Sequence, residues 1–350
     1  MIKMAQIKTY QSEIDRKNTV KLQEILSELP VICKKYFEDR STNTSSRTQL
    51  GYARDIKMFF LWLTASDDRF IGKDPHSLTM DEIKFIDRDD IQDFVTYVRS
   101  DEQRANDNFA IARKMSALSS LWSYIARVYD DIKNPVSTVS YPKLHDIEII
   151  KLEPNETAHL LDVIENSADY FPGRQGAYLA NTRERDLAIV ALLLGTGIRV
   201  SECVGLNLTD VHLEECRISI RRKGGKMGMA ALSDEVIEIL SSYLAVRPKD
   251  VECEAFFLSL QNKRLCIQAI ENMLAKYVKA AGINKNITPH KLRKTFGTDL
   301  YEATSDIYLV ASALGHSDVK TTTKHYATQS DQRLLEARKN IVLRGKKEDK

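Results

Sequence analysis

Apolar residues recur every three or four positions through most of this chain, which predicts a mainly helical protein. A weakly amphipathic stretch, residues 1–40, comes first, and a polar loop separates it from the stronger patterns. Those patterns predict helices over residues 48–63, 89–97 and 108–129. Asn134-Pro135 then ends the helical block. We therefore expect a helical N-terminal domain, residues 1–135, and a polar linker, residues 136–153.

The remaining chain, residues 154–350, mixes helices with a pair of strands. Residues 183–194 become apolar on all sides, which predicts a helix at the centre of this domain. Residues 216–222 alternate as a strand, Gly224-Gly225 can form a tight turn, and residues 227–232 return. Further segments are expected as helices, with a polar insert at 170–182: residues 155–166, 234–246, 266–281 and 331–343. The fold class is thus mainly α with a small antiparallel β-sheet in the C-terminal domain.

The stretch from Thr288 to Tyr326 carries ionisable residues at places where a purely structural helix pair would not need them. Thr288 can cap a helix and Pro289 fits its first position. The buried stripe of that helix is expected to be Leu292, Phe296 and Leu300. His290 and Arg293, three residues apart, lie at the edge of this stripe, so both side chains could point into a cleft.

A second apolar run, residues 307–314, stops at Gly315, which suits a left-handed helix end. His316 follows at once, and Tyr326 lies ten residues further on. Each ionisable residue taken alone has an ordinary interpretation: a half-buried histidine, a surface arginine, a helix cap or a packing tyrosine. The combination is much more specific than its parts.

The order PHxLRxxF, then LGHS, then Tyr326 resembles the C-terminal signature of the tyrosine recombinases, the phage integrase family. TGIRVSE, residues 196–202, is similar to the family motif that holds the first catalytic arginine, here Arg199. Lys223 at the hairpin turn lies 24 residues beyond Arg199, as a lysine does in the Xer-type members. The strings RDLAIVALLLGTGIRVSE and ITPHKLR look most like Xer-type recombinases of the XerS kind.

The resemblance implies a two-domain, C-shaped DNA clamp with an N-terminal core-binding (SAM-like) domain. It also implies a site-specific recombinase that works as a homotetramer on two double-stranded DNA sites, through a 3′-phosphotyrosyl intermediate and a Holliday junction. The C-terminal helix, residues 331–343, would dock into a neighbouring subunit. The implied site residues are Arg199, Lys223, His290, Arg293, His316 and the nucleophile Tyr326, with Glu202 in support.

These residue types fit the chemistry of phosphodiester cleavage. Two arginines can bind two phosphate oxygens and stay charged at any working pH. Histidines add donors that also move protons, and a cationic pocket favours the phenolate of Tyr326 as nucleophile. Lys223 would protonate the departing 5′ oxygen. Because the covalent ester stores the phosphodiester bond, religation would need no ATP. Fixed positive donors around the phosphate would take the place of a metal ion, and no other cofactor is expected.

Composition narrows the picture without identifying a partner. Lys and Arg total 51 against 49 Asp and Glu, so DNA binding has to depend on local basic clusters. In the N-terminal domain we expect phosphate contacts from Arg104, Arg113 and Lys114, although a solvated helix face explains them as well. Five scattered cysteines without a CxxC pair favour a reduced cytoplasmic interior. No signal peptide or membrane span is expected.

Two departures from the family pattern and several alternatives stay open. Lys294 stands where many relatives have a second histidine, and Tyr326 follows His316 by ten residues rather than nine. The chain could also be a catalytically silent DNA-binding protein on the same scaffold. A metal-dependent nuclease would need clustered ligands that the sequence lacks. The sequence does not distinguish chromosome dimer resolution from integration or excision of a mobile element. It also leaves open whether an accessory DNA translocase or an element-encoded factor is needed.

Overall fold

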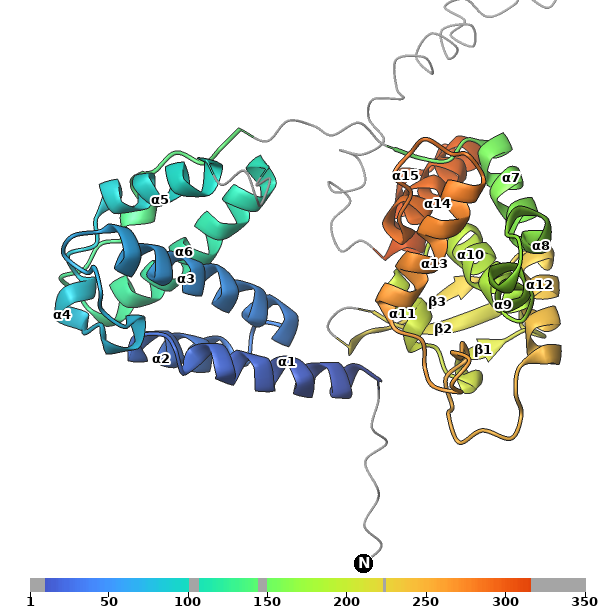
Figure 1. Cartoon of the computed structure of the whole chain (residues 1–350), viewed down its shortest axis with the longest axis horizontal. Helices are drawn as coiled ribbons and strands as arrows, with labels where there is room; N and C mark the ends of the chain where they lie inside the picture. The colour runs from blue at the N-terminus through green and yellow to red at the C-terminus, as the bar shows by residue number, and fades with distance from the viewer. Residues whose placement is uncertain (1–9, 101–106, 144–149, 223–224, 316–350) are drawn as a thin grey trace, which may run out of the picture. The chain divides into compact units, whose positions relative to one another are not determined.

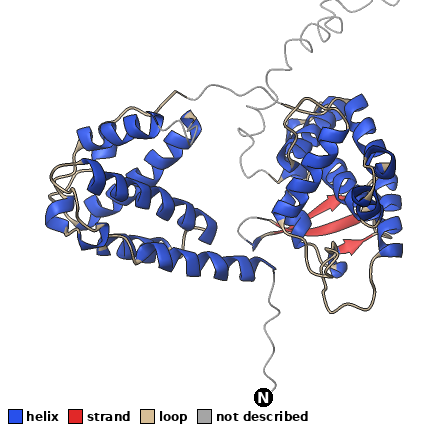
Figure 2. Ribbon diagram, in the orientation of Figure 1, coloured by secondary structure: helices blue, strands red, loops and turns tan. Residues whose placement is uncertain are grey.

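The computed structural model describes residues 10–100, 107–143, 150–222 and 225–315. The chain divides into two compact units, Met1–Ile147 and Glu148–Lys350 (Figure 1). The described part of the first unit is helical, and the second adds a three-stranded sheet to its helices (Figure 2). The prediction of a mainly α chain with a small antiparallel sheet in its C-terminal part is therefore confirmed.

The first unit packs its helices around an aromatic core. The long helices α3 and α6 contact each other, and Trp122 of α6 lies edge-on to Phe59 of α3 at a centroid distance of 5.5 Å. Both rings are fully buried, and a buried aromatic pair adds stabilisation beyond its buried area. The elements of this unit are α1 (Tyr10–Leu26), α2 (Val31–Arg40), α3 (Ser46–Ser66), η1 (Pro75–Ser77), α4 (Met80–Ile83), α5 (Arg88–Ser100), α6 (Asn108–Val128) and η2 (Pro135–Thr138).

Asn134 fastens the end of this unit to α6. Its side-chain amide donates to the hydroxyl oxygens of Ser119, at 3.3 Å, and Ser123, at 2.9 Å, and its Oδ1 caps η2 by accepting from the Val136 amide. Val136 and Val139 are buried in the core of the unit. The predicted linker therefore begins with residues that pack against α5 and α6, because Asn134 turns the chain back onto the bundle.

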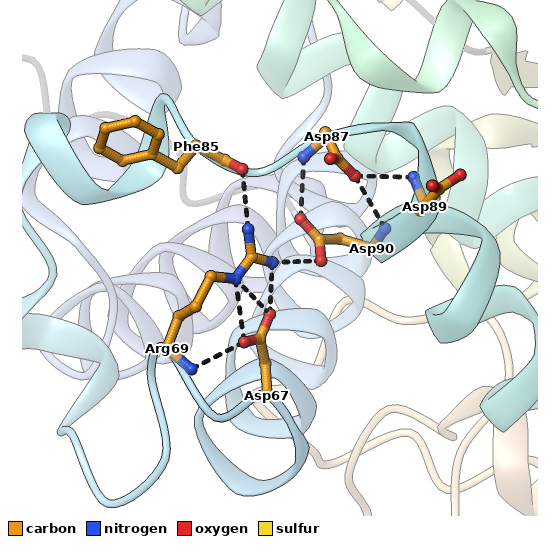
Figure 3. A network of polar contacts seen from close by, with 6 residues as sticks. All are labelled: Asp67, Arg69, Phe85, Asp87, Asp89 and Asp90. Carbon is orange, nitrogen blue, oxygen red and sulfur yellow. Dashed lines mark hydrogen bonds and ion pairs between the residues drawn. The ribbon is translucent and has the colours of Figure 1, made fainter.

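A polar network joins the loop after α3 to the start of α5 (Figure 3). The Arg69 guanidinium donates to both carboxylate oxygens of Asp67, to Asp90 and to the Phe85 carbonyl. Asp87 accepts from the Asp89 amide at 2.8 Å and so caps α5. The hydrogen bonds from Arg69 lower the pKa of Asp67. This network fixes a loop with little regular structure of its own.

The second unit is built around α10 (Arg183–Thr196), which contacts α7 (Pro154–Glu165), α12 (Asp234–Val246) and α14 (Pro289–Thr304). Residues 188–193 of α10 are all buried, so the expectation of a central helix is confirmed. The other helices are α8 (Ser167–Tyr170), α9 (Arg174–Ala180), α11 (Val200–Gly205), η3 (Leu208–Asp210), α13 (Ile267–Ala280) and α15 (Ile307–Leu314).

The sheet has the order β1 (Val211–His212), β2 (Arg217–Arg221), β3 (Met227–Ala231), and both pairings are antiparallel. Ile218 pairs with Ala230 and Ile220 with Gly228, and both isoleucines are buried. The predicted hairpin is therefore present, while β1 was not predicted because a two-residue strand has no readable alternation.

Two further details differ from the sequence-based prediction. The segment 170–182, predicted as a polar insert, contains the helix α9, and its Leu179 is buried. Thr288 takes the N-cap position of α14 but makes no side-chain capping hydrogen bond.

In the described ranges, no helix combines the length and the apolar character needed to cross a bilayer.

We predict that Arg69→Ala lowers the free energy of unfolding of the first unit by about 1 kcal/mol, since the lost bonds are charged but partly exposed. The difference in unfolding free energy between the variant and wild type should have its full size at pH 7 and should shrink below about pH 4. The reason is that a carboxylate with a lowered pKa contributes only while it is ionised. Both tryptophans, Trp62 and Trp122, lie in this unit, so tryptophan fluorescence during urea unfolding measures it selectively. Arg88→Ala, which removes a more exposed pair with Asp89, is the control, and an equal effect in both variants would contradict the prediction.

Candidate active site

Four of the predicted site residues lie in the described part of the second unit: Arg199, Glu202, His290 and Arg293. Three others, Lys223, His316 and Tyr326, lie outside the described residues, as do Arg104 and the expected docking helix, residues 331–343.

Arg199 sits at the start of α11 with its backbone in the extended region. Glu202, one turn further on, accepts from the Arg199 amide at 2.7 Å and from Arg199 Nη1 at 2.9 Å. The Glu202 side chain is 5% exposed and that of Arg199 is 38% exposed. One carboxylate thus fixes both the backbone and the guanidinium of Arg199. On the same helix Cys203 is fully buried, and burial raises the pKa of its thiol.

Arg293 is buried in α14 and binds two carbonyl oxygens from distant segments. Its Nη1 donates to the Gly197 carbonyl at 2.6 Å, and its Nη2 donates to the Leu314 carbonyl at the end of α15. Gly197 lies only two residues before Arg199. The Arg293 side chain thus joins α14 to the turn that carries Arg199 and to the helix that leads into His316.

The turn at Gly197 is tight for a steric reason. Its φ of 61° lies in the left-handed region, and a Cβ there would lie 2.3 Å from Cδ1 of Phe296. Only glycine therefore lets the end of α10 approach α14 closely enough for Arg293 to reach the Gly197 carbonyl.

His290 and Lys294 flank Arg293 on α14. His290 is exposed in the first turn, three residues before Arg293, so the two share one side of the helix. Lys294 is partly buried, and this burial, together with Lys291, lowers the pKa of its ammonium group. A cation at position 294 therefore carries a desolvation cost that a neutral imidazole would not.

Arg222, at the end of the predicted strand, was not recognised as a site residue from the sequence. Its Nη1 and Nη2 donate to the Ser312 and Ala313 carbonyls, each at 3.1 Å. Together with Arg293 on Leu314, two guanidinium groups bind three successive carbonyls at the end of α15. Cations are stabilising at this end of a helix because its unpaired carbonyls carry partial negative charge. The sequence offered one indication of a role for Arg222, which is that it directly precedes the candidate Lys223.

The two described candidates for DNA contacts in the first unit differ in burial. Arg113 is half exposed and forms an ion pair with the buried Asp55. Lys114, the next residue on α6, is 5% exposed. Burial raises the pKa of Asp55, against the opposing effect of Arg113 and Lys114. Phosphate contacts by these residues stay a prediction, and for Lys114 they would require its buried side chain to move.

The first unit also has a polar cavity of about 370 Å³ between α2 and α6. Arg40 and Arg127 line it together with four serines of α6, and Arg40 Nη1 donates to Ser120 Oγ at 2.7 Å. These arginines are cationic surface residues that the sequence analysis did not single out. Within the described ranges, the side chains of His, Cys, Asp and Glu form no group suited to hold a metal ion.

Comparisons with known proteins agree on one family. The model of the phage integrase family matches residues 151–333. Tyrosine recombinase XerS of Streptococcus thermophilus (strain CNRZ 1066) is 30% identical over 333 residues, which cover 86% of this chain and 93% of that protein. Tyrosine recombinase XerC of Caldanaerobacter subterraneus subsp. tengcongensis is 34% identical over 304 residues, which cover 84% and 81%.

Solved structures show the same fold at lower identity. XerH site-specific recombinase bound to its difH substrate in a pre-cleavage complex aligns with a TM-score of 0.67 at 22% identity, over 96% of this chain and 91% of that chain. A lambda integrase dimer bound to a COC′ core site aligns with a TM-score of 0.59 at 16% identity, over 83% and 95%.

We predict that Gly197→Ala destabilises the second unit by about 3 kcal/mol, because a strained φ and an overpacked contact with Phe296 add together. Gly282→Ala is the matched control, since Gly282 has a φ of 64° and open space around its Cβ position, and it should cost about 1 kcal/mol. Far-UV circular dichroism during urea unfolding reports the unfolding of both units. Tryptophan fluorescence reports the first unit alone, so the remaining circular dichroism transition belongs to the second unit. Equal losses in the two variants would show that the Phe296 contact is unimportant.

Proposed function

This chain belongs to the phage integrase family of tyrosine recombinases, with Xer-type site-specific recombinases among its relatives, and we propose that it cleaves and rejoins DNA strands through a 3′-phosphotyrosyl intermediate. The observation that carries the proposal is the Arg293 side chain, which ties α14 to the turn before Arg199 and to the helix before His316. That arrangement supports a single phosphate site built from segments about 100 residues apart.

In the proposed reaction Arg199 and Arg293 bind the scissile phosphate and stabilise the charge that grows in its transition state. Glu202 holds Arg199 ready, because its carboxylate already binds the guanidinium and the backbone. Arg293 is held by its two carbonyl contacts. His290 and His316 donate hydrogen bonds to the phosphate oxygens and assist proton transfer. The described hydrogen bonds hold Arg199 and Arg293 in place, which favours catalysis by positioning.

The Tyr326 hydroxyl first loses its proton to water, and the phenolate oxygen forms a bond to phosphorus as the bond from phosphorus to the 5′ oxygen breaks. Lys223 supplies the proton that the 5′ oxygen takes up. Attack of a 5′ hydroxyl on the phosphotyrosyl ester reverses the step, so the energy of the original bond is kept and no ATP is needed. Exchange of strands between two duplexes then proceeds through a Holliday junction.

The proposed partner is a double-stranded DNA recombination site, since XerH and lambda integrase were solved on such DNA. We propose a homotetramer on two sites, with the C-terminal segment in contact with a neighbouring subunit, acting in the cytoplasm. Chromosome dimer resolution and the movement of a genetic element use the same chemistry. The recovered DNA sequence is the observation that separates these two roles.

Covalent trapping tests the proposal directly. Wild type, Tyr326→Phe and Arg199→Ala would be incubated with nicked duplex fragments of the source genome and separated on a denaturing gel. We expect a protein band that carries DNA in wild type, no such band in Tyr326→Phe, and a loss of at least about 100-fold in Arg199→Ala, because one preorganised donor is removed. Binding without any covalent band in wild type would favour a catalytically silent DNA-binding protein. Arg293→Ala is a poorer test, since it also removes the two carbonyl contacts.

Lys223→Ala should slow cleavage of an ordinary duplex by about 100-fold or more, the usual contribution of a general acid. A duplex with sulfur in place of the bridging 5′ oxygen should restore cleavage, because a thiolate leaves without protonation. Lys226→Ala, at the neighbouring lysine of the same hairpin, serves as control and should leave both rates unchanged. If sulfur gave no rescue, Lys223 would not be the acid.

A further inference from the structure

Arg222 is the last paired residue of the β2–β3 hairpin before its tip. Its amide donates to the Lys226 carbonyl at 2.8 Å, and its carbonyl accepts from the Gly225 amide at 3.1 Å. Lys223 and Gly224 come between Arg222 and Gly225 in the sequence. Whatever fixes Arg222 in space therefore fixes the point from which the proposed acid Lys223 starts.

The Arg222 side chain leaves the hairpin and binds α15. Its two terminal nitrogens donate to the Ser312 and Ala313 carbonyls, about 90 residues further along the chain. The next carbonyl, that of Leu314, is bound by Arg293, which belongs to the proposed phosphate site. The base of the hairpin and the phosphate-binding arginine are thus fastened to neighbouring peptide groups of one short helix.

Two glycines provide the space for this side chain. A Cβ on Gly315 would lie 1.9 Å from Arg222 Nη1, and a Cβ on Gly228 would lie 2.5 Å from Arg222 Nε. Arg222 Nε is buried and has no hydrogen-bond partner in the part of the chain that the structure describes. An unpaired buried donor is costly, so the side chain holds this path through its two carbonyl bonds despite a penalty.

Other described residues near the tip offer little to hold it. Lys226, Met227 and Met229 are exposed, and Met227 is 65% exposed. A lysine on a hairpin that is held only by its own turn would sample many positions relative to the phosphate. A misplacement of about 1 Å in a catalytic group can cost about 100-fold in rate.

We propose that Arg222 is a positioning residue, which anchors the lysine hairpin to the carbonyl end of α15 and so holds Lys223 at the phosphate bound by Arg293. This inference rests on the proposed function of Lys223 as the general acid. Arg222 itself need not touch the DNA. Its effect should therefore appear in the protonation of the leaving group and leave DNA affinity unchanged.

The test compares Arg222→Met with Arg221→Met on the duplex recovered by covalent trapping, made with either oxygen or sulfur at the bridging 5′ position. Arg222→Met keeps most of the side-chain volume and removes the donors. We expect it to cleave the oxygen duplex about 10- to 100-fold more slowly than wild type, with unchanged Kd, and to cleave the sulfur duplex at nearly the wild-type rate. The neighbouring, exposed Arg221 makes no described side-chain hydrogen bond, so Arg221→Met should match wild type on both duplexes.

Equal slowing on the two duplexes would overturn the proposal, since the defect would then lie outside leaving-group protonation. An unchanged rate on the oxygen duplex would overturn it as well. Gly228→Ala offers a second route if Arg222→Met fails to fold, because its methyl group displaces Arg222 Nε while Arg222 stays in the chain. It should show the same selective rescue by sulfur.

Hydrogen exchange followed by mass spectrometry separates this inference from the proposed function. If wild type forms no covalent adduct with any duplex, the proposed function fails, and the anchor can still be judged in the free protein. Arg222→Met should then speed exchange in peptides that cover α15 and β3 relative to Arg221→Met. Identical exchange in the two variants would overturn the anchor itself.

Discussion

The candidate site of the second unit depends on a buried cation, Arg293, whose donors have to be satisfied. A guanidinium group removed from water costs several kcal/mol unless its donors find acceptors, and Arg293 finds them in the Gly197 and Leu314 carbonyls. Those acceptors exist only if α10 ends in a left-handed turn and α15 ends beside α14. The burial of Arg293 therefore requires all three segments to be in place. A residue with both roles cannot be removed to measure only one of them.

The end of α15 shows how the chain manages charge next to a site proposed for phosphate. The carbonyl end of a helix carries partial negative charge and would repel a phosphodiester. Arg222 and Arg293 bind three successive carbonyls there, so two positive charges cover the negative end. The net charge of +2 for the whole protein thus says little about the potential at this place. Local arrangement decides it.

Helix periodicity made most of the fold predictable, because a buried stripe such as that of α6 repeats within a few residues. For α14 the predicted stripe is only partly correct, because Leu292 is buried while Phe296 and Leu300 are half-buried. Contacts between distant segments were not predictable in this way. Arg222 finds its acceptors about 90 residues away, and nothing in its own neighbourhood specifies them. Arg113 and Lys114 look equivalent in the sequence, yet successive helical residues point about 100° apart, so Lys114 is buried while Arg113 is half exposed. For Arg199 and Arg293 the motif spacing predicted a site role, and only the structure shows what supports the two side chains.

Cys203 makes the local opening of α11, the short helix that begins after Arg199, measurable by thiol labelling. Its thiol is fully buried and its pKa is raised, so a thiol reagent can react with it only after α11 has separated from its neighbours. The rate of labelling at Cys203 would therefore measure how often α11 opens. Cys203 therefore reports local unfolding of α11 about one helical turn from Arg199, whose fixed position the proposed chemistry requires.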